Sequence, residues 1–296
     1  MSGALRIGTR GSKLALWQAN DVARRLRDAG CATTEIVPIR TSGDKRPDAS
    51  LASIGGKGVF IKELEEALVA GTIDLAVHSL KDVPSIMPDQ FVLAAFLERG
   101  DPRDAWVQRD RIPIRELPAG STIGTSAPRR RAQVRLLRPD LRLEEIRGNV
   151  DTRVAKVRSG VYAAAVLAAA GLQRLGLARE ITSYFSVDEM IPAAGQGIIV
   201  VETLRGQPLP RALNDADAEV AARCERGVLE KFDTLLDCYS AVAVHATIDR
   251  TITLRAFFSD GQTSVRVTRT GRQAAALIDS TYEELISKGA QELLAR

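Results

Sequence analysis

Apolar residues in the first hundred positions follow two alternating spacings. Short runs that are mostly apolar indicate strands, at residues 5–9, 35–39 and 73–77. Between them, helical spacing predicts one helix that Ser12 caps and a second that begins near Phe60. A polar segment, residues 41–57, precedes the second helix. Strands that alternate with helices predict a parallel sheet with helices on both faces.

The same alternation restarts after residue 103. The predicted strands are 122–125, 141–146 and 163–168, and the predicted helices are 128–138 and 150–158. A further strand, 198–202, is assigned to the first lobe. From about residue 210 a long helix precedes three alternating strands and a final amphipathic helix, which is typical of a smaller α+β domain.

The pattern therefore predicts an α/β protein with two doubly wound lobes and an α+β C-terminal domain. The predicted boundaries are residues 1–99 with 198–209 for the first lobe, 100–197 for the second, and 210–296 for the C-terminal domain.

Composition narrows the function. Arginine supplies 33 of the 41 basic residues. High genomic GC content can produce this excess, and the planar fork of donors also suits carboxylates and phosphates, so composition alone does not choose between the two explanations. A net charge of only +4, 4% aromatic residues and no recognition motif argue against nucleic-acid binding. The longest apolar run, residues 161–172, is too short to span a bilayer, so we expect no membrane association. Three scattered cysteines and no visible signal peptide indicate a reducing, cytoplasmic location.

Common cofactor signatures do not match. Lys57 lies in a Gly-Gly-Lys-Gly segment, but no Ser or Thr follows it as a Walker A loop requires. Val200 stands where a dinucleotide fingerprint that starts at Gly195 needs Gly or Ala. Two histidines and three cysteines do not form a standard zinc site, and we predict no metal.

Four loops carry arginine at the C-terminal ends of predicted strands, where open α/β sheets place ligands. These loops are residues 9–12, 125–131, 147–153 and 170–174. Hydroxyl groups, exposed amides and arginine forks at helix N-termini favour bound anions. A single arginine of this kind is usually an ordinary surface residue, but four such loops at the same end of consecutive strands favour anion binding.

The loop after strand 73–77 contains a cation beside a carboxylate. Lys81 and Asp82 suit acid–base work or the stabilisation of a cationic intermediate, although Asp82 also fits a turn residue before Pro84. His78 is predicted to be a hydrogen-bonded residue at the end of the strand. Cys238 lies in a turn and is a candidate nucleophile or attachment point, whereas Cys31 and Cys224 are expected to be inert.

Blocks of sequence between residues 5 and 197 resemble the porphobilinogen deaminase (hydroxymethylbilane synthase) family. The blocks are residues 5–19, 55–58, 76–84, 100–105, 124–130, 147–153, 170–177 and 192–197. The resemblance implies two lobes like those of type II periplasmic binding proteins. It also implies the head-to-tail joining of four porphobilinogen molecules, with loss of ammonia, into 1-hydroxymethylbilane. The implied cofactor is a dipyrromethane primer that is joined by a thioether to a cysteine.

The resemblance also implies residue roles. Asp82 would hydrogen-bond pyrrole N–H groups and assist the loss of ammonia, and Lys81 would contact primer carboxylates. Cys238 would carry the primer, although the family's small residues before this cysteine are replaced here by Leu236 and Asp237. Residues 41–57 would form a lid, with Phe60 at its edge. The residues that would bind the primer or substrate carboxylates are Arg10, Ser12, Lys57, Thr125, Ser126, Arg129, Arg130, Arg147, Gly148, Asn149, Arg153, Arg174 and Gln196.

Two other functions remain open from the sequence. A two-lobed module that binds a small anion without chemistry explains the lobes and the arginines, but not Lys81–Asp82 combined with a cysteine-bearing third domain. A family member that has lost primer attachment lies between the two. We expect a monomer, because no heptads or large apolar stripes are present.

Overall fold

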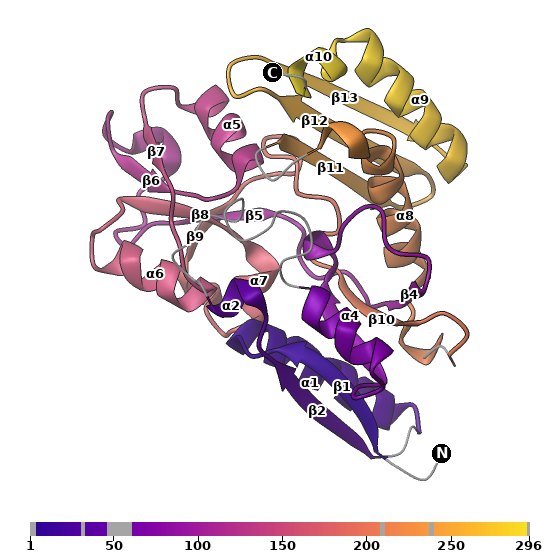
Figure 1. Cartoon of the computed structure of the whole chain (residues 1–296). Coiled ribbons are helices and arrows are strands. Elements are labelled where there is room, and N and C mark those ends of the chain that lie inside the picture. Colours follow the sequence, from indigo (N-terminus) through magenta and orange to yellow (C-terminus); the bar gives the residue numbers. More distant parts are fainter. Residues whose placement is uncertain (1–3, 31–32, 46–60, 208–210, 237–239, 295–296) are drawn as a thin grey trace. The chain divides into compact units, whose positions relative to one another are not determined.

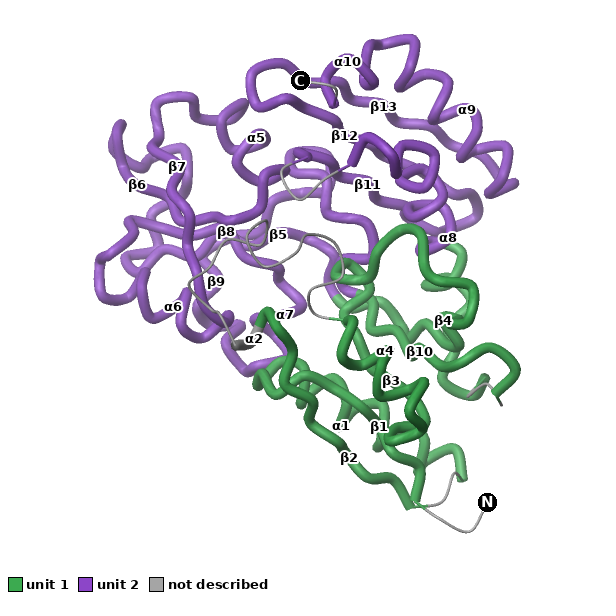
Figure 2. Tube along the Cα trace, in the orientation of Figure 1, with its two compact units in different colours: residues 1–100, 198–220 green, residues 101–197, 221–296 purple. Residues whose placement is uncertain are grey.

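The computed structural model describes residues 4–30, 33–45, 61–207, 211–236 and 240–294 (Figure 1). The chain divides into two compact units (Figure 2). The first unit contains residues 1–100 and 198–220, and the second contains residues 101–197 and 221–296. The C-terminal region thus forms one compact unit with residues 101–197.

The first unit is built on a five-stranded sheet of order β2-β1-β3-β10-β4. The strands are β1 (Leu5–Arg10), β2 (Thr34–Ile39), β3 (Leu75–Ser79), β4 (Phe91–Phe96) and β10 (Ile199–Leu204). β1 runs parallel to β2 and β3, whereas β10 runs antiparallel to β3 and β4. The sheet is therefore mixed rather than parallel throughout, because the chain returns from residue 198 to insert β10.

Two helices cover opposite faces of this sheet. Alternate residues of a strand point to opposite faces, so α1 (Lys13–Asp28) packs on Leu75 and Val77, whereas α4 (Lys62–Val69) packs on Ala76. Among the described residues of the first unit, a short helix, α2 (Ser42–Lys45), follows β2. This arrangement leaves the ends of β1 and β3 next to the start of α1.

The second unit contains another five-stranded sheet, of order β7-β6-β8-β5-β9. Its strands are β5 (Asp104–Val107), β6 (Thr122–Gly124), β7 (Arg142–Glu144), β8 (Ala164–Ala168) and β9 (Ile181–Tyr184). β6 is parallel to β7 and β8, and β5 lies antiparallel between β8 and β9. Its helices are α5 (Pro128–Leu137), α6 (Val150–Arg158) and α7 (Ala169–Arg174).

A third, antiparallel sheet of three strands completes the second unit. It contains β11 (Ala241–Ile248), β12 (Ile252–Ser259) and β13 (Ser264–Gly271), together with helices α8 (Ala216–Glu230), α9 (Ala274–Ser287) and α10 (Ala290–Leu294). The sheet packs on α5 and the segment before Gly195 through a buried cluster of Ala132, Ile191, Ala241, Ala243 and Phe257. The predicted α/β class with a smaller C-terminal sheet is confirmed.

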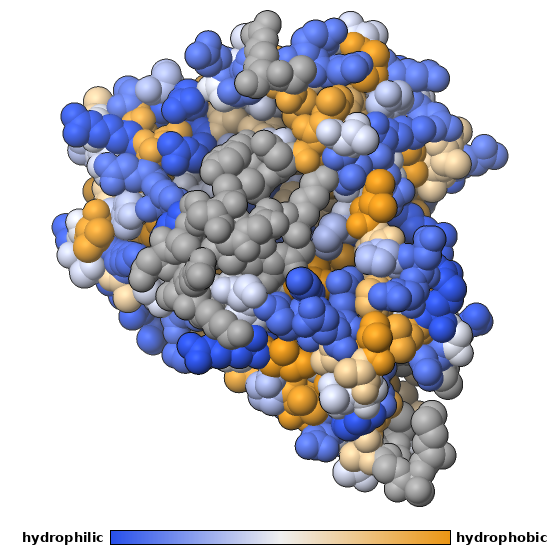
Figure 3. All heavy atoms as spheres, viewed as in Figure 1, coloured by the Kyte–Doolittle hydropathy of each residue, from blue (hydrophilic) through white to orange (hydrophobic). Residues whose placement is uncertain are grey.

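Short 3₁₀ turns join several of these elements. They are Leu80–Asp82, Ile114–Glu116, Ala178–Glu180, Arg211–Leu213 and Asp233–Leu235. Within the described residues no helix is both long and apolar enough to cross a membrane. On the face seen in Figure 3, hydrophobic residues form small separate groups among hydrophilic ones.

Candidate functional site

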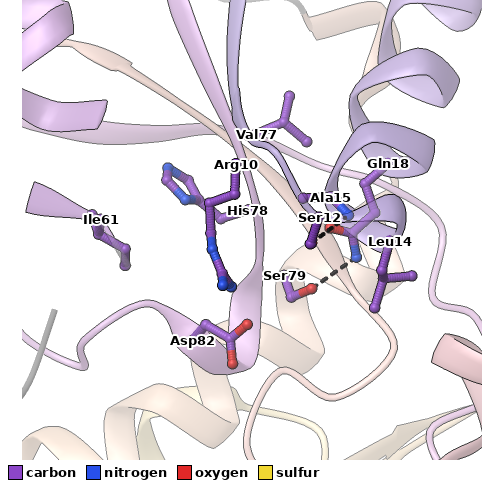
Figure 4. A pocket seen from close by; sticks show the side chains of 10 residues that line it. All are labelled: Arg10, Ser12, Leu14, Ala15, Gln18, Ile61, Val77, His78, Ser79 and Asp82. Atoms are coloured by element: carbon purple, nitrogen blue, oxygen red, sulfur yellow. Dashed lines mark hydrogen bonds between the residues drawn. The ribbon is translucent and has the colours of Figure 1, made fainter. Parts of the chain in front are cut away.

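A pocket lies at the ends of β1 and β3 in the first unit (Figure 4). Its empty space is about 400 Å³, a figure that includes space open to solvent. Its lining contains a cation, a carboxylate, an imidazole and two hydroxyl groups. The lining residues are Arg10, Ser12, Leu14, Ala15, Gln18, Ile61, Val77, His78, Ser79 and Asp82.

The first loop of the pocket is fixed by the start of α1. The Ser12 Oγ accepts a hydrogen bond from the Ala15 amide at 3.3 Å, as the predicted helix cap requires. Thr9 Oγ1 donates to the Ala15 carbonyl at 3.1 Å. Arg10 lies between Thr9 and Ser12 in the sequence. Figure 4 shows its side chain extending toward Asp82. The structure therefore brings Arg10, Ser12 and Asp82 together.

Asp82 is held by the short 3₁₀ turn that follows β3. Leu80 and Val83, on either side of the Lys81–Asp82 pair, are buried, and the Leu80 amide donates to the Ile198 carbonyl at 3.0 Å. The turn thus anchors the chain while Lys81 and Asp82 remain exposed. Asp82 lines the pocket, whereas Lys81 is not among the lining residues.

Two polar residues of the pocket were not identified from the sequence. Gln18 Nε2 donates to Ser79 Oγ at 2.7 Å, and Gln18 is only 2% exposed (Figure 4). The available signal was a polar residue on the apolar stripe of α1, which contains Ala15, Ala19 and Val22. A buried amide needs a partner, and such a residue indicates a polar site at that face.

His78 is confirmed as a hydrogen-bonded residue at the end of β3. Its Nε2 lies 2.9 Å from Oε2 of Glu202, and both side chains are buried. Val200 pairs with His78 across the β3–β10 ladder, and Glu202 follows Val200 by two residues. The side chains of His78 and Glu202 therefore lie on the same face of the sheet. The pair supports one wall of the pocket from within the core.

In the second unit, Arg129 and Arg130 lie in the first turn of α5 and are buried against one carboxylate. They are 5% and 6% exposed, and Asp104, which is fully buried, lies between their guanidinium groups. Arg129 Nη1 lies 2.6 Å from Asp104 Oδ2, and Arg130 Nη2 lies 2.7 Å from Oδ1. Asp104 was not among the residues predicted from the sequence.

Gln196 belongs to the same buried cluster. Its Nε2 donates to Asp104 Oδ1 at 3.0 Å and to the Pro102 carbonyl at 2.7 Å. Its Oε1 accepts from Nη2 of Arg129 at 3.0 Å and from Nη2 of Arg130 at 3.4 Å. These contacts join the segment before β5 to the start of α5.

The charges of this cluster act on each other strongly because water is excluded. Burial raises the pKa of the Asp104 carboxyl, but the positive charges of Arg129 and Arg130 outweigh burial and hold that pKa well below its usual range. Burial, with the repulsion from Arg129 and Arg153, lowers the pKa of Arg130 to about 10 despite the attraction of Asp104. Asp104 and Arg130 are therefore both charged at neutral pH.

The other predicted loops of the second unit also lie at strand ends. Gly148 has φ of +104°, and a Cβ there would lie 2.8 Å from the Thr152 side chain, so the turn into α6 requires glycine. Its carbonyl accepts from Nε of Arg153 at 2.8 Å. Arg147 Nη2 lies 2.6 Å from Glu145 Oε1. Asn149 is the N-cap residue of α6 but makes no side-chain cap bond.

Three more predicted residues complete this edge of the second sheet. Thr125 is buried, and its Oγ1 accepts from the Ala127 amide at 3.4 Å. Ser126 Oγ donates to the Ile146 carbonyl, and Arg174 Nη2 donates to the Gly197 carbonyl at 2.6 Å. Thr125 and Ser126 directly follow β6, as predicted. The predicted loop 170–174 is instead helical, because α7 begins directly after β8 and Arg174 is its last residue.

Cys238, Lys57 and Phe60 lie outside the described residues. Cys224 is buried in α8, and burial, with the nearby Glu225 charge, raises the pKa of its thiol to about 11. A thiol in this state is a poor nucleophile. Among the described residues, no three or more His, Cys, Asp or Glu side chains lie together in a way that could hold a metal ion.

The sequence matches a known family model and relatives that share one name. The family model described as "Porphobilinogen deaminase, dipyromethane cofactor binding domain" matches residues 5–209. A protein named porphobilinogen deaminase from Syntrophotalea carbinolica is 45% identical, with 99% of this chain and 96% of that protein covered. One of the same name from Geobacter metallireducens is 44% identical, with 98% and 94% covered.

Among solved structures, the chain is similar to the second substrate-binding domain of a putative amino acid ABC transporter from Streptococcus pneumoniae. The TM-score is 0.45 and the identity 11%, over 71% of this chain and 89% of that chain. The sequence relationship is much closer than this structural likeness, and it extends over nearly the whole chain. The chain therefore belongs to the porphobilinogen deaminase family.

Proposed function

We propose that the protein joins porphobilinogen molecules head to tail on a dipyrromethane primer. After four additions, water cleaves the bond between the new chain and the primer and releases 1-hydroxymethylbilane. The observation that carries this proposal is the pocket in which Asp82 and Arg10 lie together, in a chain of this family. Each step forms a bond between the aminomethyl carbon of one molecule and a ring carbon of the next. The C–N bond breaks, ammonia leaves with its nitrogen, and the ring carbon loses a proton.

The donors of the protein suit the substrate and the primer. Every pyrrole unit carries an acetate and a propionate, so a chain of such units presents many carboxylates. Arginine forks and helix N-termini bind carboxylates well. The residues that we assign to this role are Arg10, Ser12, Thr125, Ser126, Arg129, Arg130, Arg147, Gly148, Asn149, Arg153, Arg174 and Gln196, together with Lys57. When bound, the dipyrromethane group supplies the ring carbon that accepts the first substrate molecule.

Asp82 is the group that we assign to the chemistry. An exposed carboxylate at the mouth of the pocket accepts hydrogen bonds from a pyrrole N–H and stabilises positive charge that develops as ammonia leaves. Arg10 at the same pocket holds a substrate carboxylate and so orients the ring. Lys81 is assigned to a primer carboxylate, and Phe60 to the edge of a lid.

Cys238 is proposed as the attachment point, through a thioether. The buried Cys224 with its raised pKa supports this choice by excluding a competitor. Intact-protein mass spectrometry tests it: the purified chain should carry the added mass of a dipyrromethane, which Cys238→Ser loses and Cys224→Ser retains. Unmodified protein that releases no ammonia from porphobilinogen would contradict the proposed function.

The role of Asp82 has its own test. Asp82→Asn should lower kcat by about a hundredfold or more, the scale of a lost transition-state contact, while the KM changes little. A loss confined to KM would assign Asp82 to binding instead. Asp89→Asn, an exposed carboxylate in the same unit, serves as the matched control and should leave both constants unchanged.

We further propose that the chain works as a monomer in the cytoplasm, as its cysteine usage and the lack of heptads favour. Light scattering with size-exclusion chromatography measures the molar mass in solution and so tests whether the chain is a monomer. A stable dimer at micromolar concentration would contradict it.

A further inference from the structure

Asp104 occupies the centre of a buried cluster that the proposed mechanism does not explain. It is the first residue of β5, and the antiparallel pairing of β5 with β8 brings it to the start of α5, 25 residues further along the chain. Its Oδ1 accepts from Arg130 Nε at 2.9 Å, from Gln196 Nε2 at 3.0 Å and from Arg129 Nη2 at 3.2 Å. One carboxylate thus fixes three side chains.

The donors of Arg129 are almost entirely committed to the protein. Nη1 donates to Asp104 Oδ2 at 2.6 Å and to the Ile191 carbonyl at 3.2 Å. Nη2 donates to Asp104 Oδ1 and to Gln196 Oε1. Four of its five N–H groups therefore have protein partners, and the guanidinium plane is held in one orientation.

Arg130 is fixed in the same way from a different direction. Nε donates to Asp104, Nη1 donates to the Val166 carbonyl at 3.2 Å, and Nη2 lies 2.7 Å from Asp104 Oδ1. The guanidinium groups of Arg129 and Arg130 thus both contact the carboxylate of Asp104. A change in the position of that carboxylate moves both arginines.

The charge of the cluster is also set by Asp104. Two guanidinium groups and one carboxylate leave a net charge of +1 at a site that is almost fully buried. Without the carboxylate, two cations would lie together in the protein interior, which is strongly unfavourable. With it, one positive charge remains to attract one anionic group.

We propose that Asp104 is a positioning residue for carboxylate binding. It holds Arg129 and Arg130 in fixed orientations and reduces their combined charge to +1, so that the start of α5 receives one carboxylate of the pyrrole chain. Gln196 supports the same arrangement through Asp104 and both arginines. This inference rests on the proposed function, since it needs a ligand that carries carboxylates.

Two substitutions separate the position of the carboxylate from its charge. Asp104→Glu keeps the charge and moves the carboxylate by one methylene group, whereas Asp104→Asn keeps the size and removes the charge. The matched control is Asp110→Asn, an exposed carboxylate 3.0 Å from Arg109 in the same unit. Each variant is purified as the full chain and compared with the native protein.

Three measurements are made on each variant. Intact-protein mass spectrometry gives the fraction of molecules that carry the primer and the number of pyrrole units bound after porphobilinogen is added. Steady-state kinetics give kcat and KM for porphobilinogen. Thermal unfolding gives the folded fraction under the assay conditions, so that loss of function can be corrected for loss of fold.

We expect both Asp104 variants to lose about tenfold to a hundredfold in kcat/KM per folded molecule, the scale of a displaced positioning group. The bound chains should shift to fewer pyrrole units, and Asp110→Asn should match the native protein. The proposal is overturned if Asp104→Glu folds with native primer content and kcat/KM, or if activity falls only in proportion to the folded fraction. Native protein with neither primer nor ammonia release would instead overturn the proposed function.

Discussion

Glu225 on α8 carries a carboxylate whose loss should destabilise the second unit measurably. The side chain is fully buried. Its Oε2 accepts from the Gly195 amide at 2.6 Å, and its Oε1 accepts from the Ala246 amide at 2.8 Å. One carboxylate therefore ties the segment that contains Gln196 to β11.

The free energy of unfolding that is lost with the Glu225 carboxylate can be worked out from these two contacts. Glu225→Gln keeps one carbonyl oxygen but sets an NH₂ group against one of the two amides. The substitution thus loses one charge-assisted hydrogen bond and leaves a buried N–H unsatisfied. Together these effects should lower the free energy of unfolding by about 2–4 kcal/mol.

Tryptophan fluorescence offers a clean assay, because the chain has two tryptophans, one in each unit. Trp17 is partly exposed in the first unit, whereas Trp106 is fully buried in the second. In a Trp17→Phe background, urea unfolding followed by fluorescence reports on the second unit alone. This choice also avoids assigning one free energy of unfolding to a chain of two compact units.

Glu230→Gln is the matched control, since Glu230 is an exposed carboxylate near the end of the same helix. Its effect should remain within about 0.5 kcal/mol of the Trp17→Phe protein. If Glu225→Gln also stays within this limit, the two amide contacts do not stabilise the unit and the reasoning is refuted.

Three further predictions concern packing, reactivity and pH. Gly124→Ala should destabilise by about 1–3 kcal/mol in urea unfolding, because its Cβ would lie 2.9 Å from Ile146. Gly11→Ala, with nothing within 4 Å, should not destabilise. Peptide mapping after alkylation at pH 8 should find Cys224 unmodified in the native protein and modified in urea, because burial raises its pKa to about 11. Folding lowers the pKa of the Asp104 carboxyl. The ionised carboxylate therefore stabilises the folded state fully above the pKa of the unfolded chain, about 3.9, and this stabilisation is lost as the pH falls through the pKa of the folded state. Urea unfolding at pH 7 and pH 3.5 should therefore show a smaller difference between native protein and Asp104→Asn at the lower pH.

Sequence periodicity was sufficient for the elements with clear apolar spacing. The helix after Ser12 and the three C-terminal strands form where the pattern predicts them, and the strand predicted at 73–77 forms two residues later, as β3. The strands Phe91–Phe96, Asp104–Val107 and Ile181–Tyr184 were missed. The antiparallel insertion of these strands, or of β10 beside β4, depends on their neighbours in the sheet, which no alternation of strands and helices along the chain indicates.

The sequence by itself determined that arginines stand at the ends of consecutive strands, because each strand and the loop after it are local features. Only the tertiary structure decided what surrounds each arginine. Arg129 and Arg130 lie buried on Asp104 because β5 inserts antiparallel between β8 and β9, and no local pattern encodes that pairing. Burial holds Arg129, Arg130 and Asp104 in a fixed cluster. With water excluded, the interactions between these charges are stronger and depend closely on their positions.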